Sequence, residues 1–108
     1  MKDIFVFEKE NYARFTDILT DLLITARAWY LETCENQYRK REAETNFTNA
    51  IERFKRMDLS KCKCKEFVDL MNAIDSKIEE VKSDPCDIEK HIALSNTVIN
   101  MLKAIYII

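Results

Sequence analysis

The chain has 108 residues and a formal net charge of −2 at pH 7. This length is typical of one domain with one hydrophobic core, here residues 1–108, and the balanced charge does not by itself indicate a nucleic-acid or membrane partner. Glycine is absent and Pro85 is the only proline. Because tight hairpins depend on glycine for their backbone angles, β-rich folds are disfavoured and we predict an all-α protein.

The first predicted helix begins near Asn11 and runs to about Glu42. Its apolar residues recur at spacings of three and four, as on one face of a helix. They are Tyr12, Phe15, Leu19, Leu22, Ala26, Trp29 and Thr33. The polar sequence RKREAET interrupts this spacing and is expected to end the helix. The preceding residues, MKDIFVF, either extend the helix or pack as a short extended arm.

A short helix is predicted for residues 45–57, with Thr45 or Asn46 as its N-cap. Its buried face is expected to consist of Phe47, Ala50, Ile51, Phe54 and Met57. A break at residues 58–60 precedes a longer predicted helix over residues 61–82. The apolar residues of that longer helix alternate at spacings of three and four. They are Cys64, Phe67, Met71, Ile74, Ile78 and Val81.

The fourth predicted helix follows Ser83-Asp84-Pro85, because Asp84 can accept from free helix amides and proline is tolerated in the first turn. Its core face is expected to consist of Ile88, Ile92, Ser95, Ile99, Leu102 and Tyr106. Short connections favour antiparallel neighbours in a bundle. We therefore predict a compact bundle of three long helices and one short helix, mostly antiparallel.

The chain has four cysteines. Its sequence lacks a signal-peptide pattern and an apolar run long enough to span a bilayer, so we expect a cytoplasmic protein with no membrane partner and with free thiols. Disulfides and metal binding are the alternatives. Against a metal site, Cys62 and Cys64 are separated by one residue, and in a helix their side chains point about 200° apart. We expect no metal and no cofactor, with His91 as a half-buried polar residue.

Residues 39–65 carry nine basic and four acidic side chains, between two acidic segments. Three of the lysines lie at the predicted start of a helix, where the helix dipole favours anions over cations. If the basic clusters share one end of the bundle, they would bind a nucleotide, a nucleic acid or an acidic protein. The candidate residues for this anion site are Arg39, Lys40, Arg41, Arg53, Arg56, Lys61, Lys63 and Lys65. The alternative is that these charges only solvate the surface.

Two predicted helices carry more apolar residues than one buried face needs. On the first, Ile24, Leu31 and Tyr38 follow heptad steps on the side opposite the predicted core. On the fourth, a second seam lies beside the first and consists of Leu94, Val98, Met101, Ile105 and Ile108. Large exposed apolar patches usually mark interaction sites. We therefore expect self-association or a protein partner, the alternative being an ordinary core covered by the N-terminal arm.

Paired acidic residues raise the question of catalysis: Glu32-x-x-Glu35 and Glu66-x-x-Asp69. This pattern resembles the acidic motifs of the MazG-type nucleoside triphosphate pyrophosphohydrolases, which implies magnesium bound by these residues between helices of a bundle. The predicted helical faces instead direct Glu35 and Asp69 away from the core stripes, whereas shared metal ligands must face one another. The chain also has one histidine and no glycine for a phosphate-binding loop.

The sequence thus favours a helical bundle that acts by binding and has no catalytic activity of its own. The expected anchors of the partner interface are Ile24, Leu31, Tyr38, Leu94, Met101, Ile105 and Ile108. By analogy, such a protein would be a regulator, inhibitor or immunity-type accessory protein of a phage or virus. The alternative function is an anion binder that uses residues 39–65, and the remote alternative is a MazG-like pyrophosphohydrolase.

Overall fold

Four helices form most of the molecule. The structure, a computed structural model, describes residues 5–7, 9–57, 65–103 and 105–107. The helices are α1 (Lys9–Tyr30), α2 (Lys40–Lys55), α3 (Lys65–Ser83) and α4 (Ile88–Lys103), and a π-helical segment, η1 (Leu31–Asn36), continues α1. The all-α prediction is confirmed. The prediction of three long helices and one short one is wrong, because the helices have 22, 16, 19 and 16 residues.

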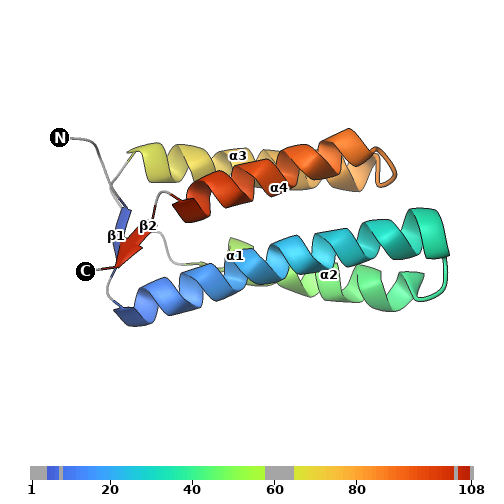
Figure 1. The fold of residues 1–108 in the computed structure, drawn as a ribbon, viewed down its shortest axis with the longest axis horizontal. Coiled ribbons are helices and arrows are strands. Elements are labelled where there is room, and N and C mark those ends of the chain that lie inside the picture. The colour runs from blue at the N-terminus through green and yellow to red at the C-terminus, as the bar shows by residue number, and fades with distance from the viewer. Residues whose placement is uncertain (1–4, 8, 58–64, 104, 108) are drawn as a thin grey trace.

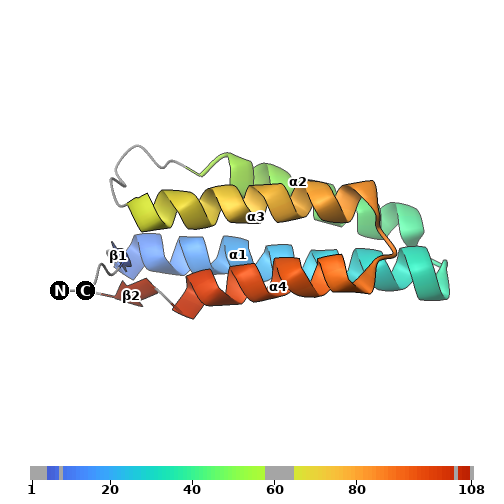
Figure 2. The ribbon, with the colours of Figure 1, turned by 90° about the horizontal axis from the view of Figure 1, so that it is seen from above.

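The bundle consists of two antiparallel helical hairpins. In Figures 1 and 2, α1 and α2 form one hairpin and α3 and α4 form the other, and α1 lies beside α4. The resulting body is elongated, with principal extents of 47 × 24 × 19 Å. Arg53 of α2 fastens the first hairpin through ion pairs of 3.0 Å to Asp17 and 3.1 Å to Asp21 of α1.

Two three-residue strands pair at one end of the bundle: β1 (Phe5–Phe7) and β2 (Ile105–Ile107). They are parallel, with Phe5 opposite Ile105, so residues 5–7 and 105–107 lie side by side (Figure 1). Of the two alternatives for the N-terminal arm, the extended one is therefore observed. The fourth helix was predicted to include Tyr106, but α4 ends at Lys103 and the β-branched sequence that follows it forms a strand.

Buried hydrophobic side chains from all four helices form one cluster. Most of the residues predicted for the core faces of the first three helices are buried. These are Phe15, Leu19, Leu22, Ala26 and Trp29 in α1, Phe47, Ala50, Ile51 and Phe54 in α2, and Met71, Ile74, Ile78 and Val81 in α3. Thr33 and Met57, by contrast, are partly buried. Cys64 lies outside the described residues, and the side chains of Tyr12 and Phe67 are not described. Regular spacing was therefore enough to identify the main buried residues wherever a helix carried one dominant apolar face.

The predicted core face of α4 is wrong. The buried residues of this helix are His91, Leu94, Val98 and Met101. Three isoleucines of the predicted core face, Ile88, Ile92 and Ile99, are exposed instead. The helix is therefore rotated by roughly 100° from the predicted orientation, which corresponds to one residue step. Both seams of α4 have helical spacing, so the spacing itself did not distinguish them.

The first helical segment ends earlier than predicted. After η1, Gln37 adopts the left-handed conformation with φ 54° and ψ 28°. Glycine usually occupies such a position because it has no Cβ atom, and this chain contains none. Helix α2 then begins at Lys40, so the expected end near Glu42 and the short second helix are both wrong.

Gln37→Gly is expected to raise the free energy of unfolding by about 0.5–1 kcal/mol, because it removes the Cβ clash of the left-handed conformation. Urea unfolding followed by circular dichroism measures the change. Glu79→Gly, at an exposed position inside α3, is the matched control and should instead cost about 1 kcal/mol. Equal destabilisation by both glycines would contradict the left-handed assignment.

Candidate functional site

The exposed apolar side chains of the described residues gather on α4. Five large hydrophobic residues are exposed in this part of the chain, and three of them are isoleucines of α4. Ile88, Ile92 and Ile99 have exposed fractions of 48%, 52% and 38%. Single exposed hydrophobic residues are normal on soluble proteins, whereas a row on one helix requires an explanation.

The three isoleucines belong to one regular seam. With Ser95 and Leu102 they follow spacings of four, three, four and three along the whole helix, and both additional residues are partly buried. We call Ile88, Ile92, Ser95, Ile99 and Leu102 the α4 seam. Such spacing places all five side chains on one side of a helix.

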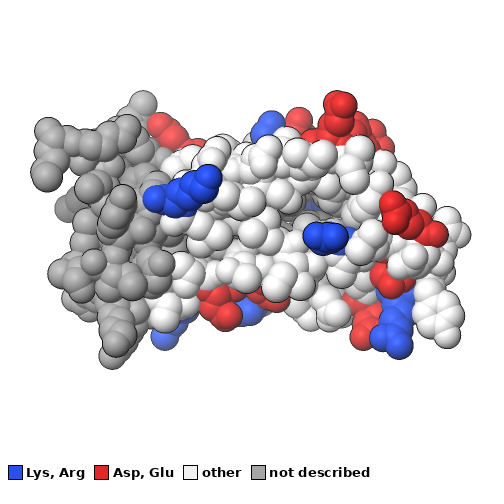
Figure 3. All heavy atoms as spheres, viewed as in Figure 1, with Lys and Arg blue, Asp and Glu red and all other residues white. Residues whose placement is uncertain are grey.

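The α4 seam borders the contact between α4 and α1. His91, the residue before Ile92, packs its ring against Tyr30 of α1 with ring centroids 4.9 Å apart. Figure 3 views the side of the molecule on which α1 and α4 lie, and charged side chains are sparse over the middle of this surface. Next to the α4 seam, Glu89, Asn96 and Lys103 are exposed at intervals of seven residues.

The seven predicted interface residues differ in how exposed they are. Leu94 and Met101 are 1% and 0% exposed, so they are core residues and neither is accessible to a partner. Ile105 lies in β2 and its side chain is not described, and Ile108 lies outside the described residues. The second seam of the fourth helix is thus buried over the described part of α4. Of the seam predicted to be buried, Ile88, Ile92 and Ile99 are exposed.

The other three predicted interface residues do not form one seam. Ile24 and Tyr38 are 63% and 84% exposed, whereas Leu31 is partly buried. The heptad steps assumed one continuous α-helix, but the π-helical turn of η1 changes the number of residues per turn, and Gln37 ends the helix before Tyr38. Ile24 therefore remains an isolated exposed side chain on α1.

The basic candidates are not gathered in one place. Arg39, Lys40 and Arg41 are exposed near the start of α2, and α3, which starts at Lys65, begins at the opposite end of the bundle (Figure 1). Lys61 and Lys63 lie outside the described residues, and the side chain of Lys65 is not described.

The arginines at the other end of α2 are engaged with carboxylates. Arg53 binds Asp17 and Asp21, and Arg56 lies 3.7 Å from Glu52. Lys55, next to them, lies 4.0 Å from Asp75 of α3. Their charge is thus already balanced within the bundle.

The acidic motifs do not converge either. Glu32 lies in η1 and accepts a hydrogen bond of 3.1 Å from the backbone N–H of Arg39, and Glu35 is exposed. Asp69 and Glu66 lie near the start of α3, at the opposite end of the bundle (Figure 1). Among the described residues, no group of three or more histidines, cysteines or carboxylates is placed to hold a metal ion. The arrangement implied by the MazG-type resemblance is therefore not formed.

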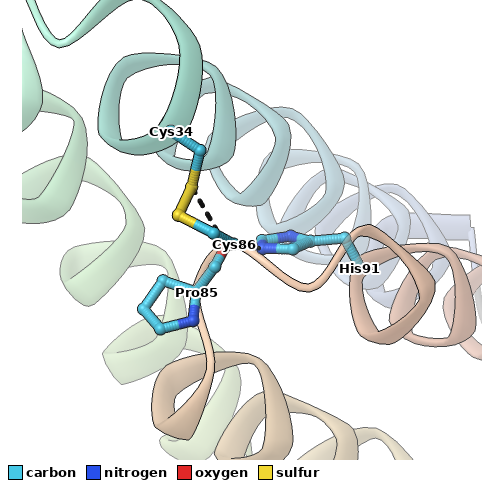
Figure 4. Close-up of a disulfide and its surroundings, with 4 residues drawn as sticks. All are labelled: Cys34, Pro85, Cys86 and His91. Carbon is cyan, nitrogen blue, oxygen red and sulfur yellow. Dashed lines mark hydrogen bonds between the residues drawn. A yellow bond between two sulfur atoms is a disulfide. The ribbon is translucent and has the colours of Figure 1, made fainter.

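A disulfide joins the two hairpins. Cys34 of η1 is bonded to Cys86, in the turn between α3 and α4, with a Cα–Cα distance of 5.6 Å. Figure 4 shows this bond beside His91, whose Nε2 lies 2.7 Å from the carbonyl oxygen of Pro85. Since a carbonyl only accepts, Nε2–H is the donor. This hydrogen bond satisfies a polar atom of the buried His91 ring. The prediction of free thiols is wrong for Cys34 and Cys86, while Cys62 and Cys64 lie outside the described residues.

A small pocket lies between α1, α2 and α3. It has a volume of about 160 Å³ and is lined by Trp29, Glu44, Phe47, Thr48, Ile51 and Lys82. Pockets for cofactors and drug-sized ligands usually have volumes of about 300–1,000 Å³. The pocket is thus too small to enclose such a ligand. None of the helices in the described part of the chain is both long and apolar enough to cross a bilayer.

Comparison with protein-family models, with curated proteins and with solved structures finds no match to this chain. Among the described residues, the row of exposed isoleucines in the α4 seam, Ile88, Ile92 and Ile99, is the candidate surface that remains.

Proposed function

We propose that the protein is a non-enzymatic interaction module that binds another protein through the α4 seam. The observation that carries this proposal is the exposure of Ile88, Ile92 and Ile99 in one row along a helix. Burial of such side chains against a partner removes apolar surface from water, which is the main driving force of protein association. A regulatory role, as an inhibitor or immunity-type accessory protein of a phage or virus, fits this mode of action.

The bundle presents the α4 seam on a rigid element. The neighbouring face of α4, about 100° away around the helix axis, packs into the core through Leu94, Val98 and Met101. The Cys34–Cys86 disulfide fixes the turn that precedes α4. A partner therefore meets a helix that is already ordered, which lowers the entropic cost of binding.

A photo-crosslinking residue placed at Asn96, which is exposed beside the α4 seam, tests the proposal. We expect protein adducts at this position, either in the purified chain or in an extract of the source cell. Ile92→Glu combined with Ile99→Glu should abolish the adducts, because charged side chains resist burial at an interface.

Two controls make this experiment specific. The same crosslinker at Glu79, an exposed position on α3, should give no adduct, and Ile24→Glu, which also replaces an exposed isoleucine, should leave the Asn96 adducts intact. No adduct at Asn96 in either preparation, or equal adducts at both positions, would refute a binding role for α4.

A further inference from the structure

We propose that the partner of the α4 seam is a second copy of this chain, with the two α4 helices packed antiparallel about a two-fold axis near Ser95 and Asn96. This inference rests on the proposed function and names the partner of the same surface.

The apolar pattern of the α4 seam is self-complementary. Its spacing of four and three residues is the pattern by which one helix packs against another. The large side chains of Ile88 and Leu102 occupy its two ends, and the small Ser95 lies at its centre. When a second seam runs in the opposite direction, large residues from one copy meet large residues from the other, and the two serines meet where the helices approach most closely.

The charges beside the seam decide the direction. Glu89, Asn96 and Lys103 lie on the same flank at intervals of seven residues. In an antiparallel pair, equivalent flanks face each other, so Glu89 of one copy lies near Lys103 of the other and the two copies of Asn96 meet at the axis. A parallel pair does not bring these opposite charges together.

Glu89 and Lys103 do not satisfy each other within one molecule. At 1.5 Å per residue they are about 21 Å apart along α4. Both side chains are exposed, and neither forms an ion pair with any other residue of the described ranges. A second copy supplies both of them with an opposite charge.

The size of the contact sets the expected affinity. A helix of 16 residues is about 24 Å long. A contact between two such helices lies at the small end of specific protein interfaces, so we expect a reversible dimer with a Kd of roughly micromolar order.

Sedimentation equilibrium of the purified full-length chain measures this assembly. Between about micromolar and about millimolar concentration, the mass should rise from 12.8 kDa towards twice that value. Ile99→Glu should raise the Kd by about 100-fold or more, because it places two charges in the apolar contact. Ile24→Glu, at an exposed isoleucine of α1, is the matched control and should not change the Kd.

A charge exchange tests the antiparallel arrangement. Glu89→Lys alone and Lys103→Glu alone should each weaken the dimer roughly tenfold, because each places like charges together twice in the symmetric dimer. The double variant should restore the wild-type Kd to within about threefold. Since both residues are exposed and too far apart to interact within one chain, only contact between copies explains such a rescue.

The partner, the location on α4 and the antiparallel arrangement are each refuted by a different result. A folded wild-type chain that stays monomeric over the whole range overturns the second copy as partner, and adducts at Asn96 in the cell extract would then still support the proposed function. A dimer that survives Ile99→Glu refutes the location on α4. Absence of rescue by the charge exchange refutes the antiparallel arrangement.

Discussion

Loss of the Cys34–Cys86 disulfide is expected to lower the free energy of unfolding by about 4 kcal/mol. The bond joins residues that are 52 positions apart in the sequence. It therefore restricts the unfolded chain strongly, because loop closure removes more conformational entropy as the loop grows. For a chain of this size, the same loss should lower the Tm by more than about 15 °C.

The double variant Cys34→Ser and Cys86→Ser tests this prediction by urea unfolding in the absence of reductant. Wild-type protein in dithiothreitol should show the same loss, because Cys86 is exposed and its bond is accessible to thiols. The control is the double variant in dithiothreitol, whose stability should not fall further. Equal stability of wild type and double variant, or free Cys34 and Cys86 thiols in peptide maps of the native protein, would contradict the assignment.

The Cys34–Cys86 disulfide could not be predicted from the sequence. Free thiols follow from the expectation of a reducing cytosol, whereas disulfides persist in oxidising compartments. Spacing along the chain also gave no indication, since Cys34 and Cys86 are distant in sequence and only the packing of the two hairpins brings them together.

Most of the bundle could be predicted from local pattern. Absence of glycine indicated helices, and one dominant apolar stripe identified the core residues of α1, α2 and α3. The end of α1 could not be predicted, because Gln37 occupies a position for which glycine is the usual signal. The positions predicted for the basic residues are wrong for the same reason. Arg39 and Arg41 were predicted to lie at the end of a helix, but they lie at the start of one, because α2 begins at Lys40.

An exposed apolar row on the fourth helix could be predicted from the sequence, but the residues that form it could not. An excess of apolar residues on the fourth helix indicated that one seam lacks a place in the core. Two seams of equal regularity left open which one is buried, and the choice depends on how the helix is oriented by its neighbours. Cys86 holds the start of α4 near η1, and His91 packs between Pro85 and the aromatic rings of Trp29 and Tyr30. These contacts fix the orientation in which Leu94 faces the core.

Two neighbouring substitutions on α4 measure this orientation directly. Leu94→Ala is expected to lower the free energy of unfolding by about 2–5 kcal/mol, because a fully buried side chain is replaced by a cavity. Ile92→Ala removes a side chain of the same size that is 52% exposed, and should cost less than about 1 kcal/mol. Urea unfolding at a dilution where sedimentation shows monomers separates these effects from self-association. The opposite order of the two losses would mean that the face of α4 first predicted from the sequence is the one in the core, and the α4 seam would then be unavailable to any partner.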